Sequence, residues 1–407
     1  MTATERRNFF GGLWHAAFLA VGMALTQPTT VIASFVAELT GSTVWVGGLS
    51  TVLTVAGVLP QLFVARWIEP RRTKMPYLML AIYLRTASWA ILAWLIFTIG
   101  ASHPDLLAWS LVGLLAVFYA GGGLGGIPYT DIIGKVIPAD RRGLFFGGKE
   151  ALAGPLAVGA ALLARRILAD VPYPNNYALL FGLAAVGLAV ASIGFWIIRE
   201  PPREDAPGRP APWRAYWRQL ADTARRIKAL VIVQLLTGFS LMALPFYVVY
   251  AREELGAPPG AVGWFLFVQV SGGVLADLLW ARLVDRAGSR TMLTVCAVTS
   301  LAAPLLAIAL GSLGWPGLLP TFFLVGAAFN GRRVGFQSAL LEIAPAAERP
   351  TFSAMNAVLV LPVAFLPLLA GVLLKNWSYP VLFGFVAVFI ALGAVWTRKL
   401  PAKEEIA

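Results

Sequence analysis

The sequence predicts an all-α membrane protein with twelve transmembrane helices, arranged as two pseudo-symmetric bundles of six helices. The composition is 58% hydrophobic and only 13% charged, whereas about 25% of the residues in soluble domains are charged. Twelve apolar stretches are about 20 residues long or longer, which is the length that a helix needs to cross the hydrocarbon core. Short sequence blocks of the first half recur in the second half, which predicts two copies of one structural design.

The expected helices follow one another through short connections, with one exception. The spans are 10–37, 44–65, 76–99, 106–134, 143–169, 176–198, 229–251, 260–283, 291–312, 316–343, 352–375 and 378–398. The exception is a long hydrophilic stretch, rich in Pro and in mixed charge, as linkers are. We therefore expect a first bundle at 1–198, a cytoplasmic basic linker at 199–227 and a second bundle at 228–407.

The net charge of +12 is distributed as in a membrane protein. If the N-terminus lies in the cytoplasm, the cytoplasmic segments hold nearly all of the Lys and Arg residues outside the spans. This positive-inside bias predicts a multi-pass protein of the plasma (inner) membrane with both termini in the cytoplasm. It favours the lipid bilayer, and not nucleic acid, as the partner of the basic residues. The first apolar stretch is long and has no obvious cleavage site, so we expect it to be retained.

Two pairs of similar blocks carry the internal repeat. Residues 281–290 read ARLVDRAGSR, and residues 65–74 read ARWIEPRRTK. Residues 135–148 and 342–355 share Pro, Arg and Phe at the same spacing. Each block joins two apolar stretches through a short charged turn, as in a helical hairpin that crosses the bilayer twice.

The block 281–290 resembles the loop signature G-x-L-A-D-R-x-G-R-R of the major facilitator superfamily. The matching residues are Leu283, Asp285, Arg286, Gly288 and Arg290, whereas Ala281 and Ser289 depart from the signature. The first-half copy is degenerate. The resemblance implies the twelve-helix fold of that family and secondary transport by alternating access between two bundles.

The first three spans contain a bend signal and a charge. Pro28 removes a backbone hydrogen bond and should bend the first helix, and Pro245 lies at nearly the equivalent place of the seventh helix. His15 is either a proton relay or a plain hydrogen-bonding residue. Arg85 lies inside the third span, where a charge costs about 3 kcal/mol. We favour a structural role for Arg85, in which it pairs with Asp131 or with nearby carbonyls, over contact with substrate.

Residues 119–131 of the fourth span read YAGGGLGGIPYTD. In a membrane such glycines allow close helix approach, local bending or a ligand against bare backbone. The Gly spacing does not indicate nucleotide binding, because no strand precedes it. In the fifth span, residues 153–159 resemble the antiporter signature G-P-x-x-G-G with the glycine one place late. This favours export, and the alternative is an ordinary Gly-Pro kink.

The tenth span carries the strongest candidate for a substrate contact. Asn330, Arg333 and Gln337 are spaced three and four residues apart and form one polar stripe, whereas Arg332 shares its stripe with apolar residues and should face protein. The family resemblance implies that helices 1, 4, 7 and 10 line a central cavity. A guanidinium there suits a carboxylate or phosphate. The candidate substrate-binding residues are Arg333, Asn330, Gln337, Gln27, Tyr119 and Gln234. The alternative is an internal salt bridge from Arg333 to Glu150 or Asp131.

Other charged residues are candidates for gating and coupling. We expect Lys149 and Asp277 to close the cytoplasmic side together; the alternative is that each pairs within its own bundle, for example Lys149 with Asp131. Asp285 is expected to act as a conformational latch with neighbouring bases. The candidates for proton coupling or gating are Glu150, Lys149, Asp277, Asp131, Asp285, Arg286 and Arg290.

The sequence thus predicts a secondary transporter for a small organic solute, anionic or zwitterionic, with protons as coupling ion and export favoured over import. We expect a monomer that needs no cofactor and binds no nucleic acid. The alternatives are a substrate sensor with the same fold that has lost transport, and a polytopic membrane enzyme. The enzyme is disfavoured because the chain has only 2 His, in unlike positions. Metal binding is not expected.

Overall fold

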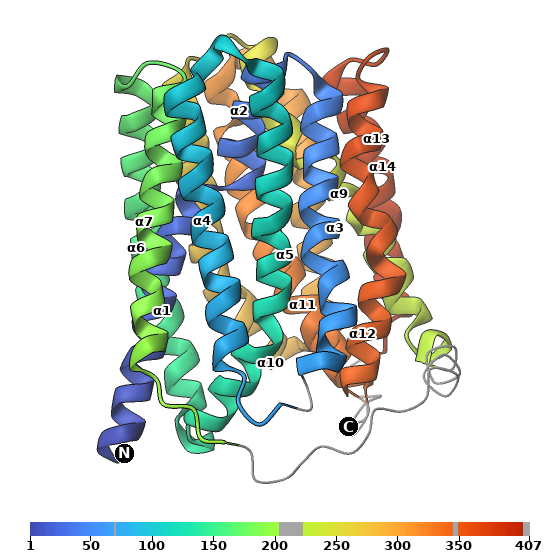
Figure 1. Cartoon of the computed structure of the whole chain (residues 1–407). Helices are drawn as coiled ribbons and strands as arrows, with labels where there is room; N and C mark the ends of the chain where they lie inside the picture. The colour runs from blue at the N-terminus through green and yellow to red at the C-terminus, as the bar shows by residue number, and fades with distance from the viewer. Residues whose placement is uncertain (69–70, 203–222, 345–348, 402–407) are drawn as a thin grey trace. The chain divides into compact units, whose positions relative to one another are not determined.

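A computed structural model describes the chain except for residues 69–70, 203–222, 345–348 and 402–407 (Figure 1). The regular elements that it describes are all helical, so the predicted all-α fold is confirmed. The helices of the first half are α1 (Ala3–Leu25), α2 (Ala33–Thr40), α3 (Thr43–Ile68), α4 (Met75–Ile99), α5 (Pro104–Val136), α6 (Arg142–Asp170) and α7 (Asn175–Ile197). The main helices of the second half are α9 (Lys228–Glu253), α10 (Pro259–Leu310), α11 (Leu319–Ile343), α12 (Arg349–Val360), α13 (Leu366–Leu373) and α14 (Tyr379–Trp396).

Ten helical segments in the described ranges are long and apolar enough to cross a membrane. One of them contains α10, which joins two helices across Gly288, where the backbone has φ 77° and ψ 171°. Only glycine adopts this conformation readily, so the loop signature marks a break between two spans. The 25-residue helix α11 is also of membrane length, but its two arginines lower its hydropathy. With α10 divided and α11 included, the described residues contain the twelve expected segments.

The predicted bend at Pro28 is present as an interruption of the first span. Helix α1 ends at Leu25, and a π-helical turn η1 (Pro28–Ile32) leads into α2. Thr26 donates its hydroxyl to the Gly22 carbonyl at 2.9 Å. Pro28 cannot donate a backbone hydrogen bond, which explains the break at this point. The seventh span differs, because α9 runs through Pro245 as one α-helix.

The chain forms two compact units. The first comprises Met1–Gln27 and Val52–Pro210, and the second comprises Pro28–Thr51 and Ala211–Ala407. The contacts thus assign Pro28–Thr51 to the second unit. In the sequence-based prediction, this segment belongs to the first bundle, at 1–198. The division of the chain at 198 and 228 stays a prediction.

Glycines set the close helix packing inside each unit. In the first unit, a Cβ on Gly194 of α7 would lie 2.3 Å from the Gly11 carbonyl oxygen of α1. In the second unit, a Cβ on Gly326 of α11 would lie 1.8 Å from the Gln269 carbonyl oxygen of α10. Because no larger residue fits at these crossings, backbones approach each other as they do in membrane helix pairs with small interfacial residues.

Candidate functional site

The polar stripe of α11 presents two exposed side chains. Arg333 and Gln337 are exposed, whereas Asn330 is half-buried. Asn330 donates its amide Nδ2 to Asp277 Oδ2 of α10 at 3.0 Å. Gly273 leaves the room for this bond, because a Cβ there would lie 2.9 Å from Asn330 Nδ2. No ion pair of Arg333 occurs among the described residues.

Arg332 lies on a different face of α11 from Arg333. Its Nη1 donates to Thr237 Oγ1 of α9 at 2.6 Å, and its guanidinium carbon lies 5.1 Å from the centroid of the Phe336 ring. The two neighbouring arginines therefore have different surroundings: one is held inside the second unit and the other is exposed. This is what a turn of about 100° between successive helical residues produces.

The remaining predicted substrate contacts are divided between the units. Gln27 and Tyr119 belong to the first unit, and both are half-buried. Gln234 lies on α9 in the second unit and is buried. Its Oε1 has no hydrogen-bond partner within the described part of the chain. A role of these three residues in substrate binding stays a prediction.

The two residues expected to form a cytoplasmic gate each have a contact in their own unit. Lys149 Nζ lies 4.0 Å from Glu150 Oε1 and 6.0 Å from the centroid of the Tyr129 ring. Asp277 accepts the hydrogen bond from Asn330. The proposed Lys149–Asp277 gate therefore stays a prediction.

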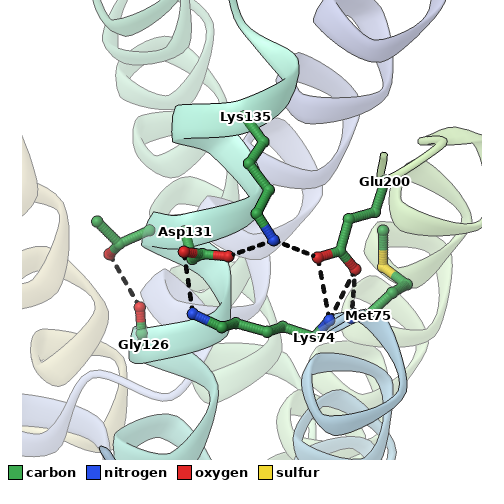
Figure 2. Close-up of polar contacts among 7 residues, drawn as sticks. Lys74, Met75, Gly126, Asp131, Lys135 and Glu200 are labelled. Carbon is green, nitrogen blue, oxygen red and sulfur yellow. Dashed lines mark hydrogen bonds and ion pairs between the residues drawn. The ribbon is translucent and has the colours of Figure 1, made fainter. Parts of the chain in front are cut away.

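An ion network in the first unit corrects the expected partner of Arg85 and Lys149. Asp131 pairs with Lys74 at 2.9 Å and with Lys135 at 2.7 Å, and Figure 2 shows both ammonium groups directed at this carboxylate. Lys135 also contacts Glu200 at 2.9 Å. The expected pairing of Asp131 with Arg85 was wrong, because Lys74 and Lys135 hold this carboxylate.

Glu200 was missed by the sequence-based reasoning, although its carboxylate completes this network. It accepts hydrogen bonds from the backbone N–H groups of Lys74 and Met75, both at 2.8 Å for Oε2 (Figure 2). These donors belong to the start of α4, which has no capping side chain of its own. The first N–H groups of a helix lack partners inside the helix, and a carboxylate is favoured there by the helix dipole. The residues after α7 thus cap α4.

The loop signature holds a second bond between helices. Ser289, which stands where the signature has a base, donates its hydroxyl to Glu342 at the end of α11. Asp285 and Arg286 are exposed, and Arg290 is half-buried. The latch role of these three residues stays a prediction. Within the described ranges, no three His, Cys, Asp or Glu side chains are grouped to share a metal ion.

The chain is similar to a protein-family model, to uncharacterized bacterial proteins and to several solved transporter structures. Residues 230–406 match the model of the Major Facilitator Superfamily. Uncharacterized proteins of Mycobacterium tuberculosis and Mycobacterium bovis are 26% identical over 333 residues, which is 76% of this chain. This chain spans only 59% of the length of those relatives.

Three solved transporters share the fold over nearly the whole chain. A nucleoside transporter, NupG, has a TM-score of 0.72 at 12% identity and covers 97% of this chain and 99% of its own. A bacterial homologue of the iron transporter ferroportin in an inward-facing state has a TM-score of 0.71 at 12% identity, with 98% and 99% covered. A peptide transporter in complex with sulfate has a TM-score of 0.69 at 14% identity, with 97% and 93% covered. At this level of identity the likeness concerns the fold alone.

Proposed function

We propose that this chain is a member of the major facilitator superfamily and a secondary transporter that moves a small anionic or zwitterionic organic solute by alternating access. The family model and the fold support a multi-pass membrane protein. Two helical units with a site at their interface are the common design of such transporters. Proton coupling, export, a monomeric state and cytoplasmic termini in the plasma membrane belong to the same proposal.

The exposed guanidinium of Arg333 is the observation that carries the substrate class. A charge inside a membrane helix is costly and marks a functional site by default. Arg333 has no ion pair among the described residues, and Asp131, one of the two carboxylates that could neutralise it, is held by Lys74 and Lys135. A planar guanidinium binds carboxylate or phosphate groups through two parallel hydrogen bonds. These points favour a ligand anion over an internal salt bridge.

The proton-coupling part of the proposal rests on two carboxylates. Asp131 is occupied by two lysines, which leaves Glu150 and Asp277 as the better candidates. Glu150 is more than half exposed beside Lys149, and Asp277 shares a hydrogen bond with the substrate stripe through Asn330. Protonation of Asp277 would change that bond, and this gives a physical route from proton binding to Arg333 and its neighbours.

The substrate assignment is tested by binding. A set of organic acids, amino acids and phosphate esters is screened for thermal stabilisation of the purified full chain, since a ligand stabilises the folded state by mass action. The dissociation constant of the strongest ligand is then measured for Arg333→Lys, Arg333→Gln and the neighbouring control Arg332→Lys. We expect both Arg333 variants to bind at least about tenfold more weakly and the control to bind as the wild type does. Unchanged affinity in Arg333→Gln would refute the assignment.

A further inference from the structure

A cavity of about 160 Å³ is lined entirely by residues of the first unit. It is walled by α1, α4, α5 and α6, and its polar lining consists of His15, Arg85, Tyr129 and Lys149. One probe-sized water position takes roughly 10–15 Å³ of such a volume, so the cavity has room for a ligand of about ten atoms.

Arg85 lines this cavity and forms no ion pair with any residue that the structure describes. Its Nε is buried and has no hydrogen-bond partner among the described residues. Its other contacts are with uncharged groups. Nη2 donates to Met23 Sδ at 3.4 Å, and the guanidinium carbon lies 4.5 Å from the centroid of the Phe118 ring. Such contacts replace only a part of the solvation that a guanidinium loses on burial. Within the described part of the chain, Arg85 is therefore a buried cation without an anionic partner.

The glycines of α5 create the space in front of Arg85. A Cβ on Gly121 would lie 3.0 Å from Arg85 Cγ, so glycine is needed for the arginine stem to pass. A Cβ on Gly122 would lie 3.9 Å from Arg85 Nε, and a Cβ on Gly126 would meet nothing within 4 Å. The glycines thus leave the backbone of α5 without side chains on the side of the cavity that faces the Arg85 guanidinium.

Three further groups complete the polar lining, one of which is Tyr129, whose ring lies 6.0 Å from Lys149 Nζ. Lys149 supplies a second cation, and its ion pair with the exposed Glu150 is long at 4.0 Å. His15 Nδ1 lies 3.1 Å from the Ala191 carbonyl oxygen. A carbonyl oxygen can only accept, so Nδ1 carries the proton in this bond and Nε2 is left as an acceptor when the ring is neutral. The lining therefore offers two cations and one acceptor.

The second unit fills the equivalent space. The third span lines the cavity of the first unit, and the ninth span lines the corresponding space of the second unit, each with four residues at the same spacing. These residues are Leu78, Ala81, Ile82 and Arg85 in the first unit, and Leu293, Cys296, Ala297 and Ser300 in the second. In the second unit the arginine comes from the opposite wall: Arg332 reaches the space and donates to Thr237, the space itself is filled, and the adjoining cavity that Arg332 also lines measures only about 20 Å³. One half of the repeat thus closes this space around its arginine, and the other keeps it open.

We propose that the open cavity of the first unit binds a small oxyanion, a carboxylate or a phosphate group, with Arg85 as its main contact and Lys149 as the second cation. The guanidinium fork matches both groups. This site goes beyond the proposed function, since oxyanion binding at Arg85 requires neither transport nor Arg333.

The first test compares thermal stability with and without ligand. The purified full chain is heated with succinate, with inorganic phosphate and with the uncharged analogue succinamide. We expect succinate or phosphate to raise the Tm and succinamide to leave it unchanged, and the stronger of the two anions identifies the group. Arg85→Met should abolish the rise, and Arg85→Lys should weaken the binding by about tenfold or more.

The Tm of ligand-free Arg85→Met separates a binding role from a structural one. An uncompensated buried charge destabilises the protein, so its removal should leave the ligand-free Tm equal to or above that of the wild type. An arginine that holds the helices together would lower it on removal. A lowered Tm together with an unchanged anion response would overturn the proposal.

A second variant blocks the cavity and keeps the charges. Gly126→Leu fills the open space, and Gly113→Leu is the matched control, because Gly113 lies on the same helix, is exposed and has nothing within 4 Å of a built Cβ. We expect Gly126→Leu to lose the anion response and Gly113→Leu to retain it. A response that survives both Arg85→Met and Gly126→Leu, or no response in the wild type, refutes the site.

Arg333→Gln separates this proposal from the proposed function. If the cavity is the oxyanion site, Arg333→Gln retains the response to succinate or phosphate even where its transport fails. A response that is lost in Arg333→Gln and kept in Arg85→Met would place oxyanion binding on α11 and would refute the cavity site alone.

Discussion

At the scale of single residues, Glu200 shows how one carboxylate serves two purposes. It caps the start of α4 through two backbone N–H groups and neutralises Lys135 through its side chain. Its side chain is only 3% exposed, and that of Lys74 is 4% exposed. Charges so deeply buried are tolerated only while each has its partner.

Loss of this carboxylate should therefore destabilise the first unit strongly. We expect Glu200→Gln to lower the free energy of unfolding by about 3 kcal/mol, because Lys135 loses a buried partner and the cap of α4 is weakened. The double variant Glu200→Gln with Lys135→Met should recover part of this loss, since it also removes the cation that Glu200 helped to neutralise and that is left with Asp131 alone in this network. Thermal and denaturant unfolding of the purified chain measure both values.

The control for this prediction is the half-buried Glu5, whose carboxylate forms an exposed capping bond at the start of its own helix, α1. Glu5 accepts a hydrogen bond from the backbone N–H of Thr2 at 2.8 Å. Because this hydrogen bond is exposed and Glu5 has no ion pair among the described residues, Glu5→Gln should cost less than about 1 kcal/mol. Equal losses in the two variants would show that the ion network adds nothing to the cap.

At the scale of helices, the start of α3 packs against α13 inside the second unit. Thr43 donates its hydroxyl to the Gly371 carbonyl at 2.9 Å, and a Cβ on Gly47 would lie only 2.0 Å from the Pro367 carbonyl oxygen. The sequence places this segment in the first bundle, on the side opposite the cytoplasm. The contact thus joins parts of the two sequence repeats on that side, and alternating access would require it to break.

A side chain at Gly47 should therefore open this contact. We expect Gly47→Ala to increase the labelling rate of a cysteine at position 43 by an impermeant maleimide added outside the cells. The adjacent Gly48→Ala is the control, since its Cβ would lie at an ordinary 3.7 Å from Leu368 Cδ1. Equal labelling in both variants would mean that the close approach at Gly47 does not keep the segments together.

At the scale of the whole molecule, periodic apolar stretches and repeated loop blocks were sufficient to predict the all-α fold. The apolar stretch 316–343 predicted α11, although Arg332 and Arg333 interrupt its apolar run. The division of Arg332 and Arg333 between two faces also followed from helical geometry.

The partners of the buried charges could not be predicted from the sequence. Lys74, Asp131 and Glu200 are far apart in the chain, and only the packing of α4, α5 and α7 brings them together. Arg85 was expected to pair with Asp131 or with nearby carbonyls, but Lys74 and Lys135 hold Asp131. The cavity at Arg85 had a sequence signal in the glycine run of α5, but the same run is equally compatible with close helix packing.

Counterflow tests the central claim, secondary transport of an organic anion, most directly. Proteoliposomes of the purified chain are preloaded with the unlabelled ligand that the stability screen identifies, and uptake of the labelled ligand is followed over time. The account predicts transient accumulation for the wild type and for Arg332→Lys, and none for Arg333→Gln. Saturable binding by the wild type without any counterflow would contradict the account and would indicate a sensor with the fold of a transporter.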